Sequence, residues 1–133
     1  MLEYSLMVSI SDEEFSKLIA ECLDELPEQY VTGMKNVLVT YEDQPTDEQR
    51  RKQKLQPYQT LYGLYEGVPL TKRNAGYQFV LPDRITIFKL PICNAVNNKD
   101  ELKAQVKHTL WHEIAHYYGL DHEMIHEIEQ NWK

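Results

Sequence analysis

The residues best suited to chemistry lie near the end of the chain, in the segment HEIAHYYGLDH. His112 and His116 are four residues apart, so on an α-helix both imidazoles lie on one face and can reach a single ion at about 2.0–2.1 Å. Glu113 is placed to reach a water held by that ion. Gly119 stands where a helix often ends in a left-handed residue, and this turn brings His122 back as a third ligand. Three protein nitrogens plus one water are the open geometry of a catalytic zinc.

The full pattern of this segment is more specific evidence for a metal site than two histidines four residues apart would be. Its five fixed positions would arise by chance in a chain of this size on the order of once in 100,000. A solvated helix face that ends at a glycine is the alternative, and the spacing and the glycine together disfavour it. Zinc lowers the pKa of a bound water to about 7, and a carboxylate beside it can act as general base. The segment therefore predicts a Zn²⁺ site with Glu113 as the catalytic residue.

Length and composition restrict the class of protein. The 133 residues suit one compact domain, residues 1–133, and a content of 42% hydrophobic and 26% charged residues is ordinary for a globular protein. The net charge of −7 disfavours nucleic-acid binding. No apolar run is long enough for a membrane span, and the stretch at 4–10 is too short for a secretory signal, so we expect a cytoplasmic protein. The composition does not indicate an oligomeric state.

The first two thirds of the chain predict one helix and a small sheet. Ser11 and Glu14 form a capping-box pattern, and an apolar stripe with the spacing of a helix continues to Pro27. This stripe includes Cys22, which we expect to be a core thiol. Short helical turns are expected over 27–34 and 46–54. Runs rich in β-branched and aromatic residues predict strands over 37–41, 61–65 and 84–90, the last bounded by Pro82 and Pro91.

Two further helices are expected to hold the histidines. Asp100 is predicted to cap a helix that runs to about Tyr118, and Asp121 to cap a final helix. Cys93 is expected in a loop before the first of them. The apolar residues of the longer helix that should face the core are Leu102, Val106, Leu110 and Ile114. The elements together predict an α+β fold in which helices pack on a small sheet and the metal site lies on a C-terminal helix.

The chain resembles the minimal zincins, small bacterial metallopeptidase-like proteins, over residues 13–127. Besides the metal segment, the resemblance rests on LYGLYEGVPLT at 61–71, LPDRITIF at 81–88 and QVKHTL at 105–110. The resemblance implies a zincin-like α+β fold and a peptidase site, but it does not imply a particular substrate. For a zinc-dependent peptidase we expect a peptide or protein substrate. Members of that family often have aspartate at the third ligand position, where this chain has His122.

Other side chains near the segment are weaker candidates. His108 and His116 are eight residues apart, about 12 Å along a helix, so they cannot bind one ion together with His112. We expect His108 to be a hydrogen-bonding residue behind the site, and a place in the substrate cleft is the weaker alternative. His126 and Glu127 rank below His122 as the third ligand. An oxyanion stabiliser is not identified among the candidate tyrosines, which are Tyr62, Tyr65, Tyr117 and Tyr118.

Two functions compete with the peptidase. Endoribonucleases that mature ribosomal RNA have the same spacing of three histidines and often end it in Gly-x-Asp-His, but they have glycine where this chain has Glu113. A zincin fold that only binds a partner is the other alternative. If the chain is a peptidase, an extended substrate should add to an exposed sheet edge, which we expect at the strand over 84–90.

Overall fold

The structure is a computed structural model that describes residues 8–74, 76–77 and 81–132. Most of the apolar stretch at 4–10 therefore lies outside the described residues. The described helices are α1 (Asp12–Glu25), α2 (Glu28–Thr32), α3 (Asp47–Lys52), α4 (Lys89–Ala95), α5 (Lys99–Tyr118), α6 (His122–Asn131) and the 3₁₀ helix η1 (Leu70–Lys72). The described strands are β1 (Val37–Glu42), β2 (Gly63–Glu66) and β3 (Asp83–Phe88).

The three strands form one mixed sheet in the order β1-β3-β2. β1 runs parallel to β3, with Val39 opposite Ile85, and β2 runs antiparallel to β3, with Leu64 opposite Thr86. β3 is thus bonded to a neighbour on both sides. The expectation that residues 84–90 offer an exposed edge to a substrate is wrong, because β1 and β2 occupy the two edges of the sheet.

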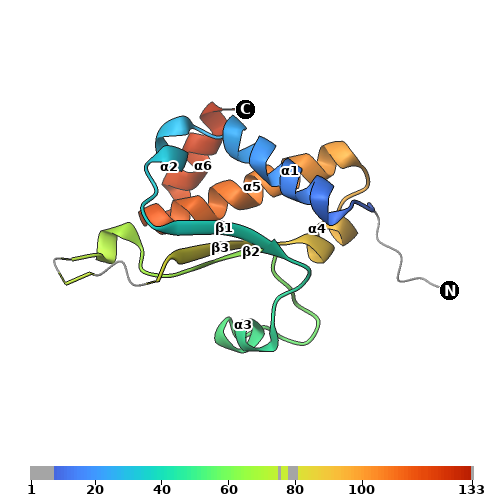
Figure 1. The fold of residues 1–133 in the computed structure, drawn as a ribbon, viewed down its shortest axis with the longest axis horizontal. Helices are drawn as coiled ribbons and strands as arrows, with labels where there is room; N and C mark the ends of the chain where they lie inside the picture. The colour runs from blue at the N-terminus through green and yellow to red at the C-terminus, as the bar shows by residue number, and fades with distance from the viewer. Residues whose placement is uncertain (1–7, 75, 78–80, 133) are drawn as a thin grey trace.

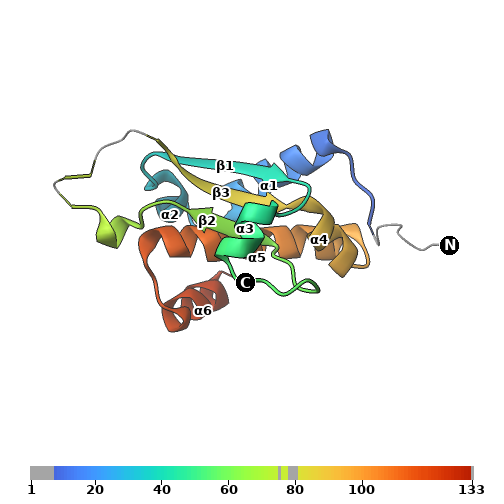
Figure 2. The same cartoon turned by 90° about the horizontal axis from the view of Figure 1, so that it is seen from below.

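Helices cover the sheet unequally on its two faces (Figure 1). α1 and α5 lie together on one face, while α3 lies on the opposite face, where Gln49 donates a hydrogen bond to Glu66 of β2 at 3.1 Å. Figure 2 shows α6 turning back alongside α5, away from the strands. The predicted α+β arrangement of helices on a small sheet is confirmed.

The first helix forms where the sequence predicts it. The side chain of Ser11 accepts a hydrogen bond from the amide of Glu14, and the Glu14 carboxylate accepts from the Ser11 amide, which completes the capping box. Phe15 and Cys22 on the apolar stripe are fully buried in the core. Cys22 is therefore a core thiol, as predicted. The short helices expected over 27–34 and 46–54 are α2 and α3.

The segment after β3 differs from the prediction. The strand ends at Phe88, and residues 89–95 form α4 instead of continuing to residue 90 and then a loop. Pro91 is the third residue of this helix, a position whose amide has no partner within the helix, so proline costs little there. As a result Cys93 lies on a helix and is fully buried, and the prediction of a loop cysteine is wrong.

The long helix α5 is anchored by its apolar face. Its predicted inward residues are at most 1% exposed: Leu102, Val106, Leu110 and Ile114. The cap is Asn98, whose side chain accepts a hydrogen bond from the Glu101 amide at 2.8 Å, so the prediction that Asp100 caps the helix is wrong. Asn98 has the extended backbone that a cap requires, while Asp100 already belongs to the first turn. Asp121 caps α6 as predicted, by accepting from the Met124 amide at 2.8 Å.

Candidate metal centre

The two histidines of the motif lie one turn apart on α5, on a side of the helix that the core does not cover. Their ring centroids are 4.6 Å apart, and both residues are partly exposed. Ile114 and Leu110, which point into the core, fix the rotation of the helix and so direct His112 and His116 outward. The prediction that both imidazoles share one face of a helix is confirmed.

Glu113 completes a compact group of potential ligand atoms with the two histidines. One such atom from each of His112, Glu113 and His116 lies within 4.8 Å of the others. The residue is only 7% exposed, and its carboxylate oxygen Oε1 lies 3.2 Å from Nδ1 of His116. A buried carboxylate so close to two imidazoles provides a proton acceptor beside the place where a cation would be held.

The surroundings shift the pKa values of His112 and His116 in opposite directions. Burial lowers the pKa of His112, which favours the neutral ring that binds metals. The hydrogen bond with Glu113 raises the pKa of His116, because the carboxylate favours the protonated imidazole. A metal ion that binds here must therefore compete with a proton at His116, and acidic solutions should weaken metal binding.

Gly119 ends α5 and sets the course of the chain toward His122. It adopts the left-handed conformation, with φ of 73°, and its amide donates to the carbonyl oxygens of the preceding turn. His122 is the first residue of α6 and is exposed, and its ring centroid lies 6.0 Å from that of His112. The three-residue cluster does not include His122, so its place as third ligand stays a prediction.

The donor set and spacing fit a zinc ion. Imidazoles that bind one zinc at about 2.0–2.1 Å in a tetrahedral arrangement have ring centres roughly 5–6 Å apart. The separations of His112 from His116 and from His122 are close to this range. Partial exposure of His112 and His116 leaves a side open for a water or a substrate. His112 and His116 can therefore contribute two nitrogen ligands to a zinc ion.

A cleft of about 550 Å³ lies between α5 and the beginning of β2. Its walls are Thr60, Leu61, Tyr62, Gly63, Gln105, His108, Thr109, His112 and Glu113. A Cβ atom at Gly63 would lie 2.6 Å from Cγ2 of Thr109 and 3.4 Å from Cγ of Glu113. The missing side chain thus lets the edge strand approach the metal helix at the position of Glu113. The sequence does not identify this glycine as a position of close packing beside the site, because nothing local reveals the long-range contact.

The four tyrosines that the sequence leaves open as oxyanion stabilisers differ in their surroundings. The hydroxyl of Tyr117 accepts a hydrogen bond from the Lys35 amide at 2.8 Å, and the hydroxyl of Tyr118 donates to a main-chain carbonyl at 2.7 Å. The hydroxyl of Tyr65 donates to Asp83. Tyr62, in contrast, lines the cleft. The hydroxyls of Tyr65, Tyr117 and Tyr118 therefore already form hydrogen bonds within the protein.

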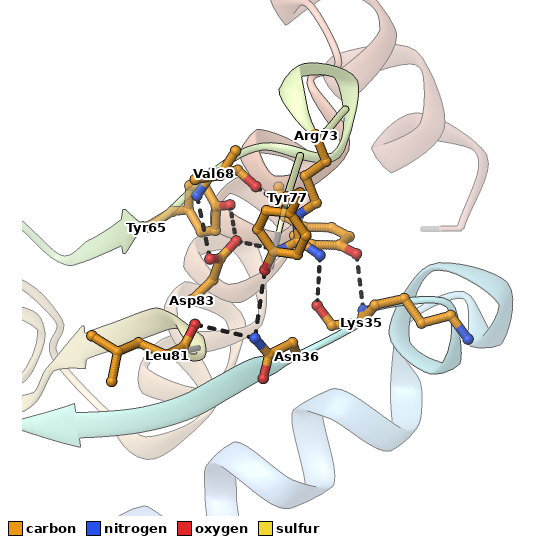
Figure 3. Close-up of polar contacts among 9 residues, drawn as sticks. Lys35, Asn36, Tyr65, Val68, Arg73, Tyr77, Leu81 and Asp83 are labelled. Carbon is orange, nitrogen blue, oxygen red and sulfur yellow. Dashed lines mark hydrogen bonds and ion pairs between the residues drawn. The ribbon is translucent and has the colours of Figure 1, made fainter. Parts of the chain in front are cut away.

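A buried ionic network supports the C-terminal end of α5 (Figure 3). Asp83 at the start of β3 pairs with Arg73 and accepts from Tyr65, and the side chains of the ion pair are 7% and 5% exposed. The Arg73 guanidinium also donates to the carbonyl of Lys35 at 3.0 Å and lies 5.0 Å from the ring centre of Tyr117. Burial and the bond to Asp83 raise the pKa of Tyr65, which keeps its phenol a donor.

The network also holds the polar segment around Arg73 in place. Arg73 is held on several sides, and η1 precedes it. Residue 75 lies outside the described residues. The network joins β2, β3 and the helix that carries the histidines, so it fixes the helix at the end where Gly119 turns the chain.

The fold and the site define a class of metallopeptidase-like proteins, and the comparison with known families agrees. The model of the zincin-like metallopeptidase family matches residues 34–132, a span that includes the whole sheet together with α5 and α6. The chain therefore belongs to the zincin-like metallopeptidase family. No curated protein matches the chain closely enough to be counted as a relative. Among the described residues, no helix has the length and apolar character needed to cross a membrane.

Proposed function

We propose that the protein is a zinc-dependent metallopeptidase that hydrolyses bonds in a peptide or protein substrate. The observation that carries the proposal is the group formed by His112, Glu113 and His116 in a chain of a metallopeptidase family. Two of its members, His112 and Glu113, line the cleft beside the edge strand β2. A metallopeptidase site needs metal ligands, a proton acceptor and a groove for an extended chain, and the residues in and beside this cleft can supply all three.

His112, His116 and His122 would hold the metal. Neutral imidazole nitrogens are common zinc ligands, and three of them leave one coordination position open. When bound, zinc polarises a carbonyl group and lowers the pKa of water, which is the chemistry that peptide hydrolysis needs. The turn at Gly119 supports the choice of His122, because it returns the chain toward His112.

Glu113 would act as the general base. Its carboxylate oxygen would accept a proton from the attacking water and later pass a proton to the leaving amine. Burial of the residue and its contact with His116 hold the carboxylate in one place. Glu113 also lines the cleft, so the reacting bond can come within reach of it.

The substrate would lie along β2. Among the described residues this strand pairs with β3 on one side only, so its other edge can form main-chain hydrogen bonds with an extended peptide. Gly63 at the start of the strand lets this edge lie close to the helix that carries Glu113. The wall opposite β2 in the cleft is α5, so an extended chain bound there would lie next to Glu113.

The first test is to assay the zinc-loaded protein, and the protein treated with a chelator, on unstructured peptides and on single-stranded RNA. The proposal predicts peptide cleavage that requires the metal and no RNA cleavage. RNA cleavage without peptide cleavage would instead favour the endoribonucleases that share the histidine spacing. A protein that holds zinc but cleaves neither substrate would favour a binding function.

A further inference from the structure

His108 lies in the same cleft as the metal motif but is too far along the helix to share its ion. It stands one turn before His112, and the two ring centroids are 6.3 Å apart. His108 lines the cleft together with Gly63 and Glu113, and half of its side chain is exposed. The sequence favours a hydrogen-bonding role for His108 behind the site, with a place in the cleft as the alternative; in the structure the residue both contacts Glu129 and lines the cleft.

Glu129 of α6 holds the imidazole of His108 from behind. Its carboxylate oxygen Oε2 lies 2.6 Å from Nδ1 of His108, and the Glu129 side chain is only 7% exposed. Sequence reasoning did not identify Glu129, although its spacing of four from the buried Ile125 places it on the inner face of α6. Because this carboxylate engages Nδ1, the ring has a defined orientation and Nε2 is left for another partner.

The free ring nitrogen is a hydrogen-bonding group in either protonation state. Nε2 accepts a hydrogen bond when the ring is neutral and donates one when the ring is protonated. It makes no hydrogen bond to another residue in the described part of the chain. Gln105 and Thr109 on the same wall differ in this respect, because Gln105 donates to the hydroxyl of Thr109 at 3.0 Å. His108 is thus the oriented imidazole on this wall that can still bind a ligand.

The distance from the metal motif indicates which part of a substrate would reach it. An extended chain advances about 3.3 Å per residue, so a separation of 6.3 Å between the rings of His108 and His112 corresponds to about two residues. A peptide whose reacting bond lies beside His112 would therefore bring a neighbouring peptide group to His108.

We propose that His108, oriented by Glu129, is a substrate-binding residue that hydrogen-bonds the main chain of the peptide one or two residues from the cleaved bond. Glu129 is a positioning residue, because it acts only through the imidazole. The proposal rests on the proposed peptidase function, and it adds a contact that extends the site along α5 beyond the metal.

A purely structural role for the pair would be to hold α6 against α5. α6 has a second anchor, however, since the indole of Trp111 donates to the carbonyl of Ile125 at 3.1 Å in the core. Loss of the imidazole should therefore leave α6 and the metal ligands in place. Measurements of ligand binding can therefore distinguish a substrate-binding role of His108 from a purely structural one.

The experiment measures the affinity of the zinc-loaded full chain for three hydroxamates, each of which binds metal through the same group. Acetohydroxamate reaches only the metal. An alanine tripeptide with a C-terminal hydroxamate and a succinyl hydroxamate of dialanine extend from the metal in opposite directions along a cleft. The proteins compared are the wild type, His108→Ala, Glu129→Gln and, as a matched control, His126→Ala, which removes an exposed histidine of α6 outside the cleft.

The proposal predicts that His108→Ala weakens at least one peptide hydroxamate by about three- to tenfold, as expected for the loss of one hydrogen bond. Binding of acetohydroxamate and the zinc content should stay as in the wild type, and Glu129→Gln should weaken the same peptide hydroxamate by a smaller factor. His126→Ala should bind all three ligands like the wild type.

Equal weakening of all three ligands by His108→Ala, or no weakening of any, would overturn the proposal. The proposal is also overturned if the wild type binds neither peptide hydroxamate more tightly than acetohydroxamate. That result would not contradict the metal site, because all three ligands would still bind the zinc. A wild type that holds no zinc, or does not bind acetohydroxamate, would instead reject the peptidase function on which the proposal rests.

Discussion

Replacing Gly63 with alanine should disturb the contact between β2 and α5 at the centre of the site. The new methyl group would lie 2.6 Å from Cγ2 of Thr109 and 3.3 Å from the carbonyl oxygen of Thr86. Carbon atoms in contact are normally about 3.5–4.0 Å apart, so Thr109 would have to withdraw by about 1 Å. The carbonyl belongs to the central strand and cannot move as easily.

The expected change in the free energy of unfolding has two contributions, the crowding in the folded protein and the conformational freedom of the unfolded chain. Overpacking of this kind destabilises a protein by about 1–3 kcal/mol. Alanine also stabilises the folded protein by about 0.4–1 kcal/mol, because it has less conformational freedom than glycine in the unfolded state. This gain applies at residue 63 because the backbone of Gly63 is not in the left-handed region. We expect a net loss of about 1–2 kcal/mol in the free energy of unfolding, measured by urea denaturation followed by circular dichroism.

A second substitution identifies the contact responsible. Thr109→Ser removes the methyl group that the new Cβ would strike and keeps the hydroxyl that accepts from Gln105. The double variant Gly63→Ala with Thr109→Ser should therefore recover about 1 kcal/mol or more relative to additive behaviour. A Gly63→Ala protein as stable as the wild type, or strictly additive effects in the double variant, would refute this account of the packing.

Three other predictions concern the network, the third ligand and the core thiol. Arg73→Ala should lower the free energy of unfolding by about 3–5 kcal/mol, because it leaves the Asp83 carboxylate buried without its cation; a loss below about 1 kcal/mol in urea denaturation would contradict this. His122→Ala should lose bound zinc while His126→Ala retains it, as measured by metal analysis, and equal loss in both would reject His122 as a ligand. Burial raises the pKa of the Cys22 thiol to about 11. At pH 8 only about one thiol in a thousand would then be ionised, so a disulfide reagent should modify Cys22 in the folded protein far more slowly than after unfolding, and equal rates would contradict the burial.

The parts of the fold that local patterns determine could be predicted from the sequence. The helix that carries His112 and His116 follows from apolar residues three and four apart, which the structure buries. The caps at Ser11 and Asp121 depend on hydrogen bonds within one turn, so the sequence alone reveals them. The metal motif itself is local, because it occupies one helix and the turn after it.

The parts that depend on distant contacts could not be predicted. The position of β3 at the centre of the sheet results from pairing with two strands far away in sequence, and no local pattern specifies this order. The side chain of Arg73 lies in a polar run that looks solvated, yet Asp83 and the ring of Tyr117 bury it. Glu129 appears as one of several acidic residues on a short helix, and only the packing of α6 on α5 brings it to His108.

The measurement that tests the central claim most directly compares Glu113→Gln with the wild type, both zinc-loaded, on a mixture of unstructured peptides. The substitution keeps the shape of the side chain and the three proposed ligands but removes the proton acceptor. The account predicts equal zinc content and a turnover lower by about 10²–10⁴-fold, whereas Glu127→Gln, on the exposed side of α6, should cleave like the wild type. Peptide cleavage by Glu113→Gln at the wild-type rate, with zinc bound in both proteins, would contradict the account.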